Sequence, residues 1–459
     1  MPENYTPPFI EPTSQPSKTL FGMIDRIKHP IKNWDTSVYT DRFFPVQRFP
    51  RKRVIVKDED SLREVFLNRN DYYGCDNYFR KLVQPLWGDG LLICDQDNWR
   101  WQRKTASHAF TSIRSRAVIP QAIRRTRASI SKWTSSSVRT DFFRDLSNLA
   151  TEISYDALIG NSGDTPEDIT EFNMAANDFS QAISTVKLAE YFKFPGWINK
   201  RTGPTRQASA SQMKAVIKNK IEVLSKKSLP QENLLAEFSK SENPITQKPI
   251  SKELLLDNIT GILIAGRDTM GITLFWALHT IASCPNVHEG ILDEIDSVTS
   301  GASVAAEHIN NLHYLRNVIY ETLRLFPPGP ILVRQCLSDV TLNGQKLREG
   351  TSIKIPVYAI HRDPHVWENP HNFRPERFDD KSLKKNTKSF SYLPFGGGKK
   401  ICIARGQALL ELISVIATLL QNVEIEFSTG QIGVEFSGGL LKPNKSVAVS
   451  IKHLKNNQI

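Results

Sequence analysis

The stretch Phe395–Leu419, FGGGKKICIARGQALLELISVIATL, places one cysteine, Cys402, between a glycine-rich turn and an apolar helix. The N-terminus of a helix carries about half a positive charge, and nearby lysines add to it, so both favour a thiolate over a thiol. Three successive glycines let the backbone approach a large, flat partner closely. The stretch therefore predicts a thiolate held against a bulky ligand.

The composition limits the classes of partner. The chain has 459 residues, of which 40% are hydrophobic, and 59 Lys and Arg residues against 48 Asp and Glu give a formal charge of +11. The basic residues are dispersed, and no helix-turn-helix or zinc-finger spacing occurs, so nucleic acid is not an expected partner. An acidic protein or a membrane surface could still bind such a chain.

The cysteines and the N-terminal sequence indicate a compartment. The five cysteines are far apart and form no Cys-x-x-Cys motif, which indicates neither a disulfide framework nor a structural zinc site. They are Cys75, Cys94, Cys284, Cys336 and Cys402. The N-terminus lacks the apolar core of a signal peptide, and no window approaches the roughly 18 uninterrupted apolar residues of a membrane span. We expect a cytoplasmic protein without a transmembrane segment.

The pattern along the chain predicts a mainly α protein with a smaller β region. Residues 1–40 are expected to be an irregular segment, and residues 41–459 a single domain. Helical periodicity dominates residues 97–285. The later stretch VTLNGQKLREGTSIKIPVYAI alternates and predicts a hairpin that turns at Asn343 and Gly344.

One predicted helix, residues 251–283, contains unusually many glycines. Ser251 is its expected N-cap. Gly261, Gly266 and Gly271 each cost roughly 1 kcal/mol relative to alanine in a helix interior. This cost favours a helix that leaves room for something beside it, and a buried core helix with small-residue packing is an equally good interpretation.

Two charged or aromatic pairs have the spacing of helix neighbours. Glu321 and Arg324 lie at i, i+3, where an exposed pair contributes only about 0.3 kcal/mol. Taken alone they indicate a surface ion pair, because burial would demand bidentate geometry and further donors to the carboxylate. Candidate donors are Arg374 and Arg377. Trp99 and Arg103, at i, i+4, taken alone indicate packing beside a solvated charge.

Together these features resemble the cytochrome P-450 family of haem-thiolate proteins over nearly the whole chain, with a soluble, bacterial-type member expected. The haem-binding signature F-x-x-G-x-R-x-C-x-G is matched by Phe395, Gly398 and Cys402. The chain departs from it at Lys400, where Arg is usual, and at Ala404, where Gly is usual. Lys400 keeps the positive charge but loses the bidentate geometry of arginine.

Four further family motifs occur in the expected order. The central-helix motif A/G-G-x-D/E-T is matched by Ala265, Gly266, Asp268 and Thr269, with Met270 where a second Thr often follows. The others are E-x-x-R at Glu321 and Arg324, P-E-R-F at residues 375–378, and W-x-x-x-R at Trp99 and Arg103. The resemblance implies a P-450 fold that holds haem between the long central helix and the cysteine loop.

The resemblance also implies a role for each matched residue. Cys402 would be the axial thiolate ligand of the iron in heme b (iron protoporphyrin IX), and the glycines would let the loop lie against the porphyrin. Thr269 and Asp268 would relay protons through water, and Gly266 would leave a gap for oxygen. Other cofactor-binding residues would be Trp99, Arg103, Arg334, Phe395 and Lys400. Structural residues would be Glu321, Arg324 and Arg377.

The implied activity is that of a monooxygenase. It would hydroxylate or epoxidise a lipophilic small molecule with O2 and two electrons from a ferredoxin or flavodoxin and its reductase. The apolar residues Ile262, Ala265, Met270 and the segment 331–333 are expected to line the substrate site. A peroxide-using or oxygen-independent haem-thiolate enzyme and a non-catalytic haem sensor are the alternatives, and retention of Asp268 and Thr269 argues against both.

A basic face near the cysteine is expected to receive the electron donor. An acidic ferredoxin or flavodoxin would approach it faster because opposite charge speeds encounter. An ordinary solvated basic surface is the other interpretation. The expected residues are Arg100, Lys104, Arg114, Arg116, Arg124, Arg125, Arg127, Lys399 and Arg405.

Overall fold

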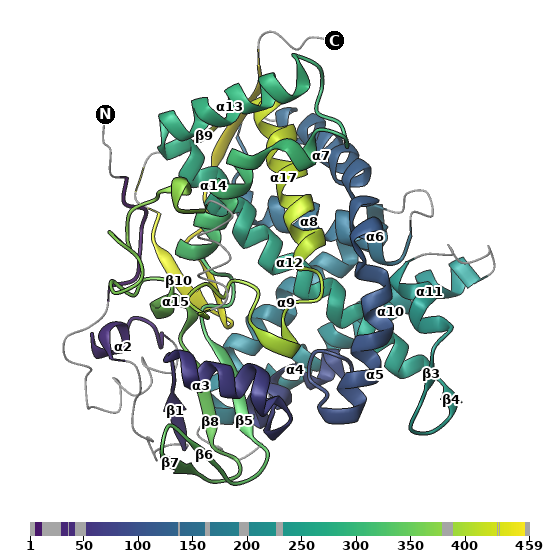
Figure 1. Ribbon diagram of the computed structural model, residues 1–459. Coiled ribbons are helices and arrows are strands. Elements are labelled where there is room, and N and C mark those ends of the chain that lie inside the picture. The colour runs from purple at the N-terminus through teal and green to yellow at the C-terminus, as the bar shows by residue number, and fades with distance from the viewer. Residues whose placement is uncertain are drawn as a thin grey trace.

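Most of the chain is described by the computed structural model. The described residues are 5–11, 29–34, 36–41, 52–135, 138–160, 166–191, 202–225, 233–378, 389–428, 430 and 432–454. Much of the segment 1–40 therefore lies outside them, although residues 37–40 form the short helix α2. Figure 1 shows a large helical body with a smaller group of strands, β1, β5 to β8, at one end.

The helices carry most of the fold. In chain order they are α2 (Ser37–Thr40), α3 (Glu59–Arg63), the π-helix η1 (Glu64–Asn68), α4 (Asn77–Trp87), α5 (Gln96–Ser107), α6 (Ser112–Arg116), α7 (Ile119–Thr134), α8 (Phe142–Leu158), α9 (Pro166–Tyr191), α10 (Thr202–Ser225), α11 (Leu234–Ser239), α12 (Lys252–Ser283), α13 (Pro285–Thr299), α14 (His313–Leu325), α15 (Val357–Ile360) and α17 (Arg405–Asn422). The predicted helical region between residues 97 and 285 is confirmed.

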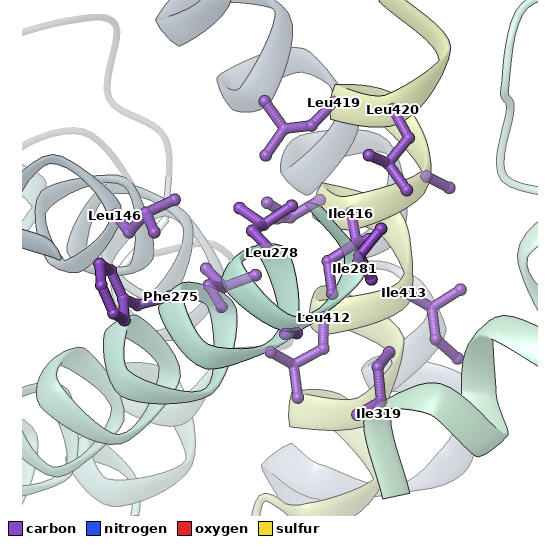
Figure 2. Packing of buried hydrophobic residues seen from close by; sticks show 14 of the residues in the cluster. Leu146, Phe275, Leu278, Ile281, Ile319, Leu412, Ile413, Ile416, Leu419 and Leu420 are labelled. Atoms are coloured by element: carbon purple, nitrogen blue, oxygen red, sulfur yellow. The ribbon is translucent and has the colours of Figure 1, made fainter. Parts of the chain in front are cut away.

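The main hydrophobic core lies where α17 crosses α12. Leu412 and Ile416 of α17 face Leu278 and Ile281 of α12, as Figure 2 shows, and all four side chains are buried. Helices α7, α8, α13 and α14 contribute to the same core. Burial of a side chain of this size stabilises the fold by about 1.5–3 kcal/mol. This packing fixes α17, and with it the loop that carries Cys402.

Helix α12 has the predicted bounds and cap. The Ser251 hydroxyl accepts the backbone N–H of Leu254 at 3.1 Å. At Gly271 an added Cβ would lie 2.2 Å from the Ser147 hydroxyl of α8, and at Gly266 it would lie 3.3 Å from the Ser154 hydroxyl. Small-residue packing of a buried helix is therefore confirmed. The space that the missing side chain leaves at Gly266 faces α8, which gives no support to the expected oxygen gap.

Helix α12 also has the length and apolar composition of a membrane span. It is the one helix among the described residues with both properties. However, 83% of its most apolar window is buried against the rest of the molecule. Its apolar character is therefore accounted for by packing within the domain.

Strands form one larger sheet and several hairpins. They are β1 (Arg53–Ile55), β2 (Tyr73–Gly74), β3 (Glu242–Asn243), β4 (Lys248–Pro249), β5 (Leu332–Cys336), β6 (Val340–Leu342), β7 (Gln345–Leu347), β8 (Ser352–Ile355), β9 (Val423–Phe427), β10 (Val434–Ser437), β11 (Leu440–Pro443) and β12 (Val449–His453). The four-stranded sheet has the order β1-β8-β5-β2, in which β1 and β8 are parallel and the other pairs antiparallel. The two-stranded sheets are β3-β4, β6-β7, β9-β12 and β10-β11.

The predicted hairpin is confirmed as β6-β7. Asn343 and Gly344 have φ values of 45° and 71°, as the two-residue turn of a hairpin requires. The end of the same stretch differs from the prediction, because residues 357–360 form the helix α15 and not a strand. Pro356 has no N–H to donate to a sheet, which suits the end of β8.

Candidate functional site

The loop before α17 holds Cys402 in a defined backbone conformation. The N–H of Cys402 donates to the carbonyl of Phe395 at 2.9 Å, and the N–H of Ile401 donates to that of Gly398 at 3.2 Å. Helix α17 begins at Arg405, so the thiol lies three residues before its first turn. Phe395 packs against the main core and closes this loop through its carbonyl.

All three loop glycines face protein, and two of them meet it closely. An added Cβ at Gly398 would lie 2.1 Å from the Phe66 carbonyl oxygen of η1, and one at Gly397 would lie 3.2 Å from the side chains of Phe66 and Leu393. Gly398 also has a φ of 63°, which disfavours side chains. These two glycines therefore fit the loop against η1, a contact that the sequence analysis did not predict.

The surroundings of Cys402 differ from those of the other cysteines. Burial raises the pKa of its thiol, while the backbone N–H of Ala404 and the guanidinium groups of Arg103 and Arg405 lower that pKa. The thiol also borders a cavity of about 600 Å³. Burial raises the pKa of Cys94 and Cys284 to about 12, and that of Cys75 and Cys336 to about 11. Among the five, Cys402 thus combines access to a cavity with donors that stabilise a thiolate.

The residues expected to neutralise propionates fall into two places. The Lys400 ammonium lies 5.4 Å from the centre of the Trp99 ring on α5 and forms an ion pair with Asp95 at 3.1 Å. Arg334 of β5 is close enough to Asp95 that this carboxylate opposes the lowering of the arginine pKa by burial. Arg103 lies beside Cys402; burial lowers the pKa of its guanidinium, and the sulfur opposes that lowering. The Lys400 ammonium therefore has an ion-pair partner within the protein, Asp95, in addition to any carboxylate of the cofactor.

Two members of this cluster were missed by sequence reasoning. Arg80 of α4 forms an ion pair with Asp95, whose side chain also accepts the N–H of Cys75 at 2.9 Å. The stretch around Arg80 matches none of the motifs used above, and Asp95 looks like an ordinary residue before a helix. Arg80 and Asp95 are far from Lys400 in the sequence, and only their proximity in the folded structure identifies them as members of this cluster.

The cluster fits the carboxylates of the expected haem. The Nε atoms of Arg80 and Arg334 are buried and lack a hydrogen-bond partner among the described residues. A buried donor without a partner costs about 1–3 kcal/mol, so these groups suit an anionic ligand. Together with the thiol of Cys402, the donor set fits a cofactor with one soft metal ligand and two carboxylates.

Glu321 and Arg324 are fully buried, contrary to the surface interpretation. Their side chains are 0% exposed and form two hydrogen bonds of 2.7 Å. The remaining N–H groups of Arg324 donate to the carbonyls of residues 361, 370 and 372. Arg377 donates to Glu321 at 3.3 Å as predicted, whereas Arg374 donates through its backbone N–H. This network joins α14 to the segment that leads to the cysteine loop.

Asp268 and Thr269 of α12 point to different partners. The Thr269 hydroxyl donates to the Ala265 carbonyl at 2.8 Å. The Asp268 carboxylate is buried and pairs with Arg267 and, at 3.3 Å, with Lys442 of β11. These two cations overcome the effect of burial and lower the Asp268 pKa. The two side chains are therefore not hydrogen-bonded to each other in this structure.

Comparisons with known proteins agree with this arrangement. The sequence profile described as cytochrome P450 matches residues 12–451. Cytochrome P450 3A6 of Oryctolagus cuniculus is 34% identical over 218 residues, which are 46% of this chain and 43% of that relative, so the match spans less than half of its length. Cytochrome P450 734A1 of Arabidopsis thaliana is 24% identical over 470 residues, 98% of this chain and 87% of the relative.

A solved structure gives the same result for the fold. The crystal structure of the cytochrome P450DA heme domain matches with a TM-score of 0.80 and 18% identity, and the match covers 98% of both chains. Identity at this level shows a shared fold alone. The family profile, however, spans nearly the whole chain. The chain therefore belongs to the cytochrome P450 family.

Proposed function

We propose that this chain binds heme b through Cys402 and uses O2 and two electrons from a separate protein to hydroxylate or epoxidise a lipophilic molecule. The carrying observation is the environment of Cys402, where burial raises the pKa of the thiol, the Ala404 N–H, Arg103 and Arg405 oppose that rise, and the thiol borders a cavity. When bound, haem with a thiolate ligand supplies the electron density that favours O–O cleavage. The protein supplies orientation, charge and protons.

Substitution of Cys402 tests the ligand assignment. Cys402→Ser should abolish the carbonyl absorption band near 450 nm that is typical of the family. Cys336→Ser, at a buried thiol in the sheet core, should keep that band and serves as the matched control. Loss of the band in the control but not in Cys402→Ser would refute the assignment.

Thr269 is the proposed donor in a water-mediated proton relay. Its hydroxyl already donates to a backbone carbonyl of α12 and can turn to a water without breaking an ion pair. The Asp268 carboxylate would have to leave Lys442 before it could pass on a proton. We therefore assign Asp268 an indirect role in the relay. Thr269→Ala should consume reductant but release peroxide in place of product. Unchanged coupling in this variant would leave Asp268 and water to carry the protons.

The proposed docking face is smaller than the sequence predicted. Several of the expected cations already have partners within the chain. The ion pairs are Arg100 with Asp71 and Asp97, Arg114 with Glu237, and Arg124 and Arg125 with Asp156. Arg127 donates a hydrogen bond to the carbonyl of Val304. Within the described residues, Lys104, Arg116, Lys399 and Arg405 have no ion-pair partner. Arg116 and Arg405 line the cavity beside Cys402.

A neighbouring apolar side chain supports protein docking at this face. Ile113 on α6 is 79% exposed and lies three residues from Arg116. An apolar side chain flanked by cations suits a partner with an apolar contact ringed by carboxylates, such as an acidic ferredoxin or flavodoxin. A solvated basic surface without a partner remains the competing interpretation. The rate of haem reduction distinguishes it from a docking face.

Charge reversal tests the docking face. Arg116→Glu with Lys104→Glu should slow haem reduction by an acidic ferredoxin, and the salt dependence of the rate should flatten. Lys346→Glu with Arg348→Glu is the control, because it makes the same change of charge at the end of the β6-β7 hairpin, away from α6 (Figure 1). Equal rates in both variants and the parent would place the docking face elsewhere.

The substrate site is proposed to be apolar. Ile262 and Met270 are both buried, but Met270 belongs to the main core with α7, α8 and α17, so the earlier assignment of Met270 to the substrate site loses its support. Ala265 and Leu332 are half-buried and remain candidates. The shift of the haem absorption band on titration with fatty acids, terpenoids and steroids would identify the class that binds.

Three other functions are distinguished by the oxidant and the electron source that each needs. Turnover with peroxide alone would indicate a peroxide-using enzyme, and product without either oxidant or reductant would indicate an oxygen-independent one. A haem sensor would bind carbon monoxide without turnover. Retention of Thr269 beside the Ala265 carbonyl favours the oxygen-dependent reaction, which should require NADPH, a reductase and a ferredoxin or flavodoxin together.

A further inference from the structure

The carboxylate of Asp95 stands among cations that are expected to face haem propionates. It forms ion pairs with Arg80 and, at 3.1 Å, with Lys400, and its negative charge also opposes the lowering of the Arg334 pKa by burial. These three cations come from α4, the cysteine loop and β5, which are far apart in the chain. A half-buried carboxylate in an anion-binding cluster needs an explanation, because it repels the ligand that the cluster would bind.

Helix capping does not explain Asp95. It is the N-cap residue of α5, but its side chain makes no capping hydrogen bond. By contrast Asp58, Asp76 and Asp141 each cap their helix with a side-chain oxygen. A cap contributes typically about 1 kcal/mol, so Asp95 gives up a local stabilisation in order to make its distant contacts.

The backbone nearby holds the carboxylate in place. Both oxygens of Asp95 accept the N–H of Cys75, at 2.9 and 3.2 Å. An added Cβ at Gly74 would lie 2.9 Å from one of these oxygens, so the adjoining strand β2 has room for the carboxylate only because residue 74 is glycine. Asp95 is therefore a fixed anchor, and the long side chains of Arg80 and Lys400 are the groups that it orders.

Lys400 is the residue that needs such an anchor. It stands where the family usually has an arginine, and a lysine ammonium on a four-carbon stem lacks the rigid fork that arginine presents to a carboxylate. Its three N–H donors allow it to bind Asp95 and a second carboxylate at once. The Trp99 ring, 5.4 Å away, restricts it from another side.

We propose that Asp95 is a positioning residue for the haem propionates, which orders Lys400 and Arg80 and so replaces the rigidity lost with the usual arginine. The unpartnered Nε atoms of Arg80 and Arg334 then remain available to the propionates. The ion pair between Asp95 and Lys400 also connects the start of α5 to the cysteine loop, because Lys400 lies two residues before Cys402. Repulsion between Asp95 and the propionates is offset by the three cations around it.

The test measures haem retention in the holoprotein. Haem transfer to excess apomyoglobin would be followed for the parent, Asp95→Asn, Lys400→Arg and the double variant. Asp95→Asn should speed haem loss about tenfold, the effect expected for one charge-assisted hydrogen bond. In the Lys400→Arg background the same change should have a clearly smaller effect, because arginine orders itself.

Two controls separate this role from a general loss of structure. Asp71→Asn removes a carboxylate that borders the same surface pocket as Asp95, Trp99 and Lys400 but pairs with the exposed Arg100, and it should leave haem loss unchanged. Asp95→Glu should restore part of the retention. Unchanged haem loss in Asp95→Asn, slower loss, or an equal effect of Asp95→Asn in both backgrounds would each overturn the proposal; slower loss would show that Asp95 only repels the propionates.

Discussion

Replacement of Glu321 by glutamine should destabilise the protein severely. The carboxylate accepts two hydrogen bonds of 2.7 Å from Arg324, one of 2.8 Å from the backbone of Arg374 and one of 3.3 Å from Arg377. All five N–H groups of Arg324 are satisfied, and the side chain is 0% exposed. Glu321→Gln keeps the shape but leaves the buried guanidinium without a counter-charge.

The magnitude follows from that burial. Breaking a buried ion pair by removing one partner costs about 3–5 kcal/mol, which at about 1.4 kcal/mol per tenfold is more than a hundredfold in the folding equilibrium. Glu368→Gln is the matched control, since Glu368 is 80% exposed and pairs with Arg374 at 3.8 Å. A surface pair of this kind contributes at most about 1 kcal/mol.

Urea unfolding of both variants, followed by circular dichroism at equal haem occupancy, measures the difference. The reasoning predicts that Glu321→Gln lowers the unfolding free energy by at least about 2 kcal/mol more than Glu368→Gln does. A difference below about 1 kcal/mol would show that the buried network relaxes or takes up water, and that burial does not set the energy of this pair.

Two further changes test packing and pH dependence. Gly271→Ala should lower the unfolding free energy by about 1–3 kcal/mol, because the new Cβ would meet the Ser147 hydroxyl at 2.2 Å, whereas Gly266→Ala should cost less because its nearest contact is at 3.3 Å; denaturant midpoints compare the two. Burial lowers the pKa of His279 from 6.5 to about 4, so the unfolded chain binds a proton that the folded protein excludes, and stability is lost as pH falls from about 6.5 to about 4. His279→Phe should reduce that loss, and an unchanged pH profile of the unfolding free energy would contradict the effect of burial.

The elements that the sequence predicts well are those fixed by neighbours in the chain. The bounds of α12 follow from Ser251 and the apolar run after it, and the β6-β7 turn follows from Asn343 and Gly344. Capping and turn geometry depend on a few consecutive residues, so the pattern is readable in the sequence itself.

The features that the sequence does not predict depend on pairs far apart in the chain. Lys400 meets Asp95 across 305 positions, and Gly398 is required by the Phe66 carbonyl. Several arginines of the expected docking face lose their availability to carboxylates that only the fold brings near them, as Asp156 does for Arg125. Spacing within a motif gives no information about such partners, and the same limit made Glu321 look like a surface residue.

The contacts across the chain also have a consequence for its synthesis. Strand β1 pairs with β8 through Arg53 and Ser352. Phe66 and Asp95 contact the cysteine loop, which follows them by about 300 residues in the chain. At about 5–20 residues per second, a ribosome needs roughly 15–60 s to make that interval. During this time the early strand edge and the anchor for Lys400 have no partner, so the nascent chain is open to misassembly. The loop that carries Cys402 is therefore made well after the strand and helix that hold it in place.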